Sequence, residues 1–96
     1  LVDLGDRYCV TSNRESGFGR YDVILEPKNN KDDAVILEFK VQDTGDEKSL
    51  SDTVKAALDQ INRKQYDTVL LEKGIPENKI RKYGFAFHGK QVLIGK

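Results

Sequence analysis

The chain has 96 residues, which is enough for one domain with a single core and too few for two such domains. Hydrophobic residues make up 38% and charged residues 33%, and 16 basic side chains balance 16 acidic ones. This composition excludes a disordered chain and a polycation that holds nucleic acid by bulk charge alone. No apolar run approaches the ~20 residues of a membrane-spanning helix, so we expect no membrane partner. We expect one domain over residues 1–96 and, because the first residue is Leu1, a piece of a longer protein.

The chain has few side chains that bind soft metals. The lone Cys9 cannot form an internal disulfide or a cysteine-based zinc site, which favours a reducing compartment such as the cytoplasm. We expect Cys9 itself to be a small, buried apolar residue. Because there is one histidine, a metal site would be built from carboxylate oxygens. Such a site favours a hard cation, Mg²⁺ or Mn²⁺.

Three strands are predicted in the N-terminal half. Residues 21–26 and 34–41 are rich in β-branched and aromatic side chains, and the polar stretch 27–33 between them has the composition of a hairpin loop. A shorter run, residues 7–11, predicts a further antiparallel strand before them. We expect the polar, glycine-containing residues 12–20 to form the connection between the first two strands.

The hydrophobic period then changes from that of a strand to that of a helix. Apolar residues recur at helical spacing over residues 50–61, and Ser49 is placed to cap this helix. Helical spacing continues over residues 66–70 after a polar break. Gly74 and Pro76 then end it.

The C-terminal residues return to the pattern of strands. Aromatic side chains alternate over residues 83–87, and Gly89 with Lys90 predicts a tight hairpin turn before a last strand over residues 91–94. We expect the aromatic side chains to belong mostly to the core, although such a stripe can also stack on single-stranded bases. The order β-β-β-α-β-β predicts a mixed sheet with a helix packed on it, an α/β or α+β fold.

Three charged residues are predicted to meet on this sheet. Side chains of a strand alternate between two faces, so Glu38 and Lys40 share a face, roughly 6.5–7 Å apart along the strand. If the hairpin pairs residues 21–26 with residues 34–41, Asp22 comes close to Glu38. Glu15 lies just upstream, in the polar connection.

These residue types suit the hydrolysis of a phosphodiester bond. Two converging carboxylates can hold a hard divalent cation, and the backbone carbonyl of Phe39 is a further oxygen ligand beside them. Such a cation polarises a phosphodiester oxygen and acidifies a bound water. Lys40 can orient that water, help to deprotonate it or stabilise developing negative charge.

The ordered set of segments resembles the PD-(D/E)XK nuclease superfamily. The resemblance covers nearly the whole chain, from about Tyr8 to Lys96. It rests on Asp22, on the Glu38-Phe39-Lys40 triplet, and on residues 13–25, 36–40, 56–61, 64–66 and 84–90. These segments are similar to a branch that often occurs C-terminal to an AAA-ATPase-like domain in bacterial proteins. The resemblance implies a restriction-endonuclease-like fold whose first core helix is missing here, a DNA substrate, a Mg²⁺ or Mn²⁺ cofactor and an upstream ATPase-like partner domain.

The resemblance also implies a role for single residues. Asp22 and Glu38 would be the metal ligands, together with the Phe39 carbonyl, and Lys40 would be the catalytic lysine. Glu15 would be an additional acidic residue directed at the metal or at a water. Tyr21 stands where many members have a proline.

The resemblance extends to the helix. Gln60 and Tyr66 resemble the glutamine and tyrosine of a motif of RecB-like members, although six positions separate them here instead of four. The alternative, purely structural interpretation is that Gln60 lies at the polar edge of the helix and that Tyr66 belongs to the core. Arg14 and Arg20 are candidates for phosphate contact, or for ion pairs in the connection.

Two functions are therefore open from the sequence. The first is a metal-dependent nuclease-like domain that acts on DNA. The second is a non-catalytic module that binds nucleic acid or protein, in which Glu38 and Lys40 form an ordinary solvated ion pair. A positive groove around Glu38 would favour nucleic acid, and a surface of mixed charge would favour a protein partner.

Overall fold

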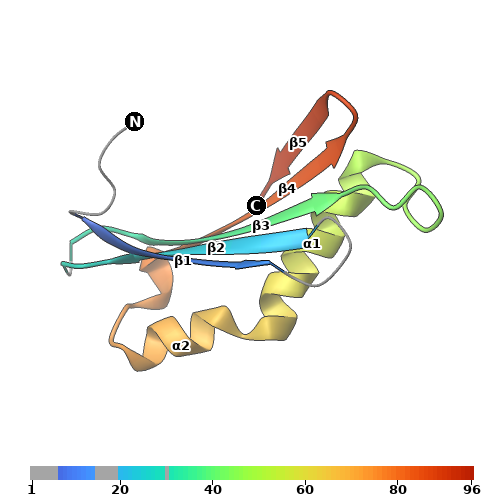
Figure 1. Cartoon of the computed structure of the whole chain (residues 1–96). Helices are drawn as coiled ribbons and strands as arrows, with labels where there is room; N and C mark the ends of the chain where they lie inside the picture. The colour runs from blue at the N-terminus through green and yellow to red at the C-terminus, as the bar shows by residue number, and fades with distance from the viewer. Residues whose placement is uncertain (1–6, 15–19, 30) are drawn as a thin grey trace.

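The strand-forming runs of the sequence assemble into one mixed sheet of five strands, in the order β1-β2-β3-β4-β5 (Figure 1). The computed structural model describes residues 7–14, 20–29 and 31–96, apart from the side chain of Arg14. The strands are β1 (Tyr8–Arg14), β2 (Arg20–Pro27), β3 (Ala34–Val41), β4 (Ile80–His88) and β5 (Gln91–Gly95). Neighbouring strands are antiparallel, except that β3 and β4 are parallel. The predicted mixed α+β fold is confirmed.

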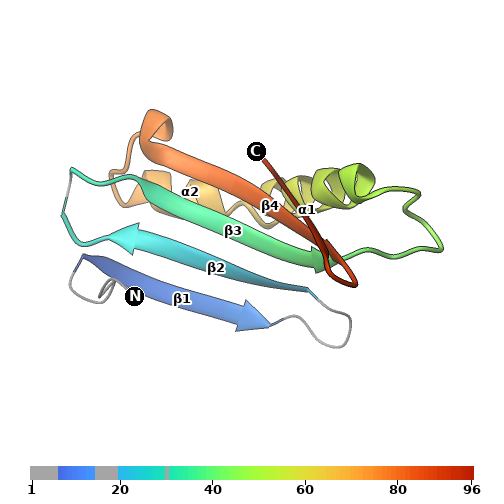
Figure 2. The same ribbon diagram turned by 90° about the horizontal axis from the view of Figure 1, so that it is seen from above.

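The parallel pair β3 and β4 requires a crossover, and two helices supply it (Figure 2). α1 spans Leu50–Lys64 and α2 spans Tyr66–Glu72, and the short 3₁₀ helix η2 (Glu77–Lys79) leads into β4. Ser49 caps α1 as predicted, since its side chain accepts the Asp52 N–H. Gln65 adopts a left-handed conformation with φ of 55°, which separates the two helices and changes the direction of the chain. None of the helices in the described part of the chain is long and apolar enough to cross a membrane.

The first strand differs from its prediction. β1 continues to Arg14, because Ser12, Asn13 and Arg14 pair with β2 although their side chains are polar. Antiparallel pairing satisfies backbone groups whatever the side chain, so the ladder extends into a stretch that composition assigns to a loop. The expected burial of Cys9 is wrong: Cys9 is exposed, because β1 is the edge strand and α1 packs on β3, β4 and β5 instead.

The core lies between the helices and one face of the sheet. Its buried cluster consists of Ala34 and Ile36 on β3, Ile61 on α1 and Leu70 on α2. Ala34 and Ile36 have the strand period of two, and the buried apolar residues of α1 have the helical period of three to four, namely Val54, Ala57 and Ile61. The same face of β3 continues from Ile36 to Glu38 and Lys40, so the polar part of the face is an extension of the core.

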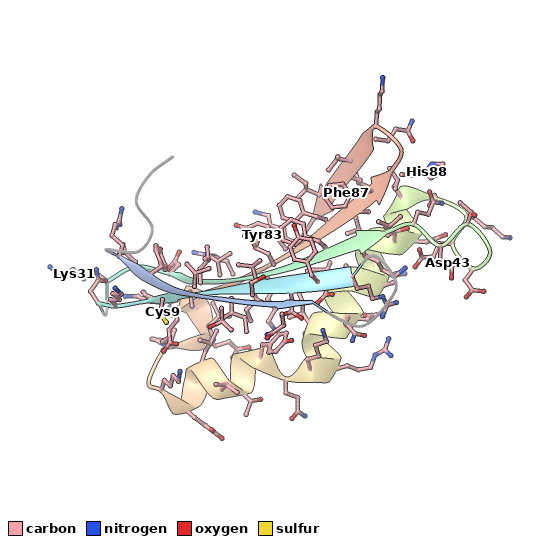
Figure 3. All side chains as sticks on the ribbon, in the orientation of Figure 1. Cys9, Lys31, Asp43, Tyr83, Phe87 and His88 are labelled. Atoms are coloured by element: carbon pink, nitrogen blue, oxygen red, sulfur yellow. The ribbon has the colours of Figure 1, made fainter. Side chains whose placement is uncertain are left out.

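The opposite face of the sheet is apolar and carries no helix among the described residues. On β3 it presents Val35, Leu37, Phe39 and Val41, which are half-buried or exposed. Phe39 stacks on Tyr21, with ring centroids 4.5 Å apart, and on Phe85, at 4.8 Å. Figure 3 shows Tyr83 and Phe87 on the side of the sheet opposite α2. The predicted aromatic stripe is therefore present, but its side chains are only half-buried.

Close packing of α1 on β4 predicts an effect of a single methyl group. A Cβ at Gly84 would lie 3.0 Å from the Val54 carbonyl oxygen and 3.2 Å from the Ala57 Cβ. We expect Gly84→Ala to lower the free energy of unfolding by about 1–3 kcal/mol, because the helix backbone must shift. Denaturant unfolding measures the change. Gly45→Ala, in an exposed loop, is the control, and an equal loss in both variants would contradict this account.

Candidate active site

Asp22 and Glu38 occupy paired positions of neighbouring strands. The register of β2 and β3 places them directly opposite each other, and both side chains face the helices. Both residues are fully buried, with 0% of their surface exposed. A buried carboxylate needs positive charge or hydrogen-bond donors around it, because the interior cannot solvate it as water does. The predicted proximity of Asp22 and Glu38 is thus present in the structure, and the pair needs compensation from other elements.

Three elements supply partners for Asp22. The Asn13 amide on β1 donates to Oδ1 at 3.1 Å, and the Lys64 ammonium at the end of α1 donates to Oδ2 at 2.7 Å. The Tyr66 hydroxyl at the start of α2 donates to the same Oδ2 at 2.8 Å. Burial, and then the hydrogen bond to the Asp22 carboxylate, raise the pKa of Tyr66 to about 12. Tyr66 is therefore a protonated donor at neutral pH, and it holds Asp22 in position.

Lys64 links the two carboxylates. Its Nζ lies 2.7 Å from Asp22 Oδ2 and 3.8 Å from Glu38 Oε1, so both carboxylates point toward the same ammonium. The Tyr66 ring lies beside it, with its centroid 5.6 Å from Nζ. The left-handed residue Gln65 makes this arrangement possible, because it ends one helix after Lys64 and starts the next at Tyr66.

Lys40 belongs to a second cluster on the same face of β3. Its side chain is 5% exposed, and its Nζ lies 2.7 Å from Glu47 Oε2. Glu47 Oε1 accepts hydrogen bonds from the Asp43 N–H and from the Thr53 hydroxyl on α1. Burial raises the pKa of Glu47, but the hydrogen bonds from Lys40, Asp43 and Thr53 outweigh it and leave that pKa below its ordinary value of 4.5. The pair ties the end of β3 to the start of α1.

The structure describes some of the other residues that the sequence predicted for the site, and not all of them. Arg20 is half-buried and pairs with Lys40 in the register of β2 and β3. Gln60 is half-buried on α1, four positions before Lys64. The Phe39 side chain points to the apolar face, so only its backbone carbonyl is a candidate ligand. Glu15 lies outside the described residues, as does the side chain of Arg14, which ends β1.

Sequence reasoning left the roles of Asn13 and Lys64 unassigned. Asn13 falls in a stretch that composition assigns to a loop, but its strand register places it beside Asp22. α1 continues beyond residue 61, where its predicted helical spacing ends, and so includes Lys64. The spacing of four residues from Gln60 is the signal that could have pointed to Lys64. Glu47 has no local signal of this kind, because a loop brings it to Lys40.

The oxygen donors of the site fit a hard cation. The two carboxylates converge, and Mg²⁺ is often bound by one or two carboxylates while it keeps several waters. Within residues 7–14, 20–29 and 31–96, no group of three or more His, Cys, Asp and Glu side chains is placed to hold a metal ion. Asp22 and Glu38 are thus the two carboxylates that the described residues offer, with the Phe39 carbonyl as a further candidate, and such a set suits a cation that completes its shell with water.

A mixed five-stranded sheet that is covered by helices and carries two buried carboxylates on paired strands defines an α+β domain with a restriction-endonuclease-like fold. The model of one protein family, described as the PD-(D/E)XK nuclease superfamily, matches residues 1–96, and the chain belongs to this superfamily. Its members generally use divalent metals. Comparison with curated proteins and with solved structures gave no match.

The hydrogen bond from Tyr66 to Asp22 predicts a loss of stability in Tyr66→Phe. The substitution removes one of the donors of a fully buried carboxylate, so we expect a loss of about 1–3 kcal/mol in denaturant unfolding. Tyr83→Phe, on the opposite face of the sheet, is the control. An unchanged stability of Tyr66→Phe would show that this hydrogen bond contributes nothing.

The lowered pKa of Glu47 predicts a dependence of stability on pH. The contribution of this group is present above about pH 4.5 and is lost as pH falls through its lower folded pKa. We expect Glu47→Gln to lose about 3 kcal/mol at neutral pH, because Lys40 stays buried without its counter-charge. Its stability should then fall less steeply than that of the wild type between about pH 5 and pH 3.

Unfolding by denaturant at a series of pH values measures both effects. Asp67→Asn is the comparison variant. Hydrogen bonding to Lys82 also lowers the pKa of Asp67, so its pH curve should flatten too, but its loss at neutral pH should be smaller because this pair is half-buried. Parallel pH curves for the wild type and Glu47→Gln would contradict the prediction.

Proposed function

We propose that this domain hydrolyses phosphodiester bonds of DNA with the help of a divalent cation, Mg²⁺ or Mn²⁺. The observation that carries the proposal is the convergence of two fully buried carboxylates, Asp22 and Glu38, in a member of a nuclease superfamily. Burying two carboxylates side by side costs stability, and a cation-binding role gives a reason to keep them. Asp22, Glu38 and the Phe39 carbonyl would hold the cation.

The proposal assigns a separate role to each residue of the site. The bound cation supplies Lewis-acid chemistry, which polarises a phosphoryl oxygen and makes water a better nucleophile. Asn13 and Tyr66 fix the orientation of the Asp22 carboxylate, which makes them positioning residues. Lys40 would orient the attacking water or stabilise developing negative charge, with its own charge maintained by Glu47. Glu15, directed at the metal or at a water, and Gln60 remain candidate catalytic residues, as the resemblance implies.

The proposed substrate is DNA, with Arg14 and Arg20 as candidate phosphate contacts and Tyr66 as a further candidate at the edge of the site. Several other basic side chains are already neutralised in ion pairs. These pairs are Arg7 with Asp32, Lys73 with Glu26, Arg81 with Asp33 and Lys82 with Asp67. Binding through few phosphate contacts would depend only weakly on salt. An upstream AAA-ATPase-like domain, acting in the cytoplasm, completes this proposal.

The apolar face of the sheet favours a second candidate function, a non-catalytic module that binds protein. Tyr21, Phe39, Phe85 and Phe87 form a stacked group there, and Val41, Val92 and Ile94 add exposed apolar surface. Contiguous apolar surface of this kind is typical of a contact with another protein segment. The surface charges are mixed in sign, which also suits a protein partner.

The proposed nuclease activity predicts the effect of two substitutions, Asp22→Asn and Glu38→Gln. Each removes one negative charge from the cation site, and we expect Mn²⁺ affinity and metal-dependent DNA cleavage to fall by about 100-fold or more. Calorimetry measures the affinity, and cleavage of single- and double-stranded DNA measures the activity. Asp33→Asn is the matched control, because it makes the same chemical change at an ion pair in the loop before β3.

Each outcome decides between the two functions. Metal binding and cleavage that survive both substitutions would rule out the nuclease proposal. Cleavage that is absent from the wild type, with unchanged capture of a protein partner by both variants, would favour the second function. Circular dichroism of each variant shows whether the sheet is intact.

A further inference from the structure

The Lys64 ammonium lies close to both carboxylates that are proposed to hold the cation. It contacts Asp22 Oδ2 at 2.7 Å and comes within 3.8 Å of Glu38 Oε1, and these are the two carboxylates proposed to bind metal. The carboxylates are fully buried, whereas the Lys64 side chain keeps 17% of its surface exposed. Lys64 therefore lies between the carboxylate pair and solvent.

Three features hold the ammonium in this place. α1 ends at Lys64, and the left-handed residue Gln65 turns the chain so that Tyr66 lies beside it. The Tyr66 ring faces Nζ with a centroid distance of 5.6 Å, and the Tyr66 hydroxyl binds the same oxygen of Asp22 as Lys64 does. Contacts with two carboxylates and with the face of an aromatic ring thus fix the position of the Lys64 ammonium.

Lys40 cannot take the same position while its own pair is intact. Its ammonium is held by Glu47 at 2.7 Å, and Glu47 is in turn fixed by Asp43 and Thr53. The lysine of the sequence triplet thus serves the junction of β3 and α1. The lysine on the helix is the one that meets the carboxylate pair.

We propose that Lys64 is a built-in counter-cation of the Asp22–Glu38 pair, and that a divalent cation binds by displacing it. This inference rests on the proposed function, because it assigns the regulation of the same site. Two buried carboxylates need nearby positive charge, and either an ammonium or a divalent cation provides it. A cation held by these carboxylates would share them with Lys64, and the like charges of the two would repel, so the two would compete. The ammonium offsets part of the negative charge of the pair without metal, and it lowers the apparent affinity for metal.

The test is the Mn²⁺ affinity of Lys64→Met, measured by calorimetry without DNA. Methionine keeps an unbranched apolar side chain of similar length and removes the charge. We expect Lys64→Met to bind Mn²⁺ at least about tenfold more tightly than the wild type, because no ammonium has to leave. Lys73→Met is the matched control, since Lys73 pairs with Glu26 at an exposed position, and its affinity should equal that of the wild type.

A second measurement covers the case in which Lys64→Met folds poorly without metal. The melting temperature of each chain is followed with increasing Mn²⁺, since a ligand stabilises the form that it binds. We expect Lys64→Met to melt lower than the wild type without metal and to gain more from Mn²⁺. Equal or smaller gains, or an Mn²⁺ affinity that is unchanged or weaker in Lys64→Met, would overturn the competition.

The outcomes also separate this inference from the proposed function. Tighter Mn²⁺ binding by Lys64→Met, with no DNA cleavage by the wild type, would establish the exchange and contradict nuclease activity. Metal-dependent cleavage by the wild type, with an Mn²⁺ affinity that Lys64→Met does not raise, would support nuclease activity and overturn the exchange. A lack of Mn²⁺ binding in both chains would overturn the exchange.

Discussion

The pairing of Asp22 with Glu38 across β2 and β3 is the constraint on which the polar half of this domain depends. It places two carboxylates side by side under a helix, where water cannot solvate them. Lys64 and Tyr66 reach Asp22 from the junction of α1 and α2, and Asn13 reaches it from the end of β1. Elements that are distant in sequence are thus held together by the need to compensate one buried pair.

The helical crossover contacts the charged residues of the sheet at both of its ends. At its start, Thr53 and Glu47 fix the ammonium of Lys40, and at its end the left-handed Gln65 directs Lys64 and Tyr66 onto Asp22. Between the two ends the helix contributes the apolar core. The same face of β3 therefore changes from hydrocarbon to charge without leaving the interior.

The two faces of the sheet differ in chemical character. The helix-covered face holds the charged residues, and the other face presents stacked aromatic rings with exposed valine and isoleucine side chains. A sheet of five strands with apolar residues on both faces is typical of a sheet that packs on two layers. Within the described residues one of these layers is present, so the aromatic face is the natural place for a further contact.

The sequence by itself determined the order of the elements, the proximity of Asp22 to Glu38 and the superfamily, because strand and helix periods are local and the segments are specific. It did not determine which lysine meets the carboxylates. Lys40 lies two residues from Glu38, but Lys64 comes into contact only after the chain has crossed the sheet and turned at Gln65. The role of Asn13 likewise depends on the register of β1. Such long-range contacts have no periodic signal, and only the tertiary structure decided them, since it brings together groups that the chain keeps apart.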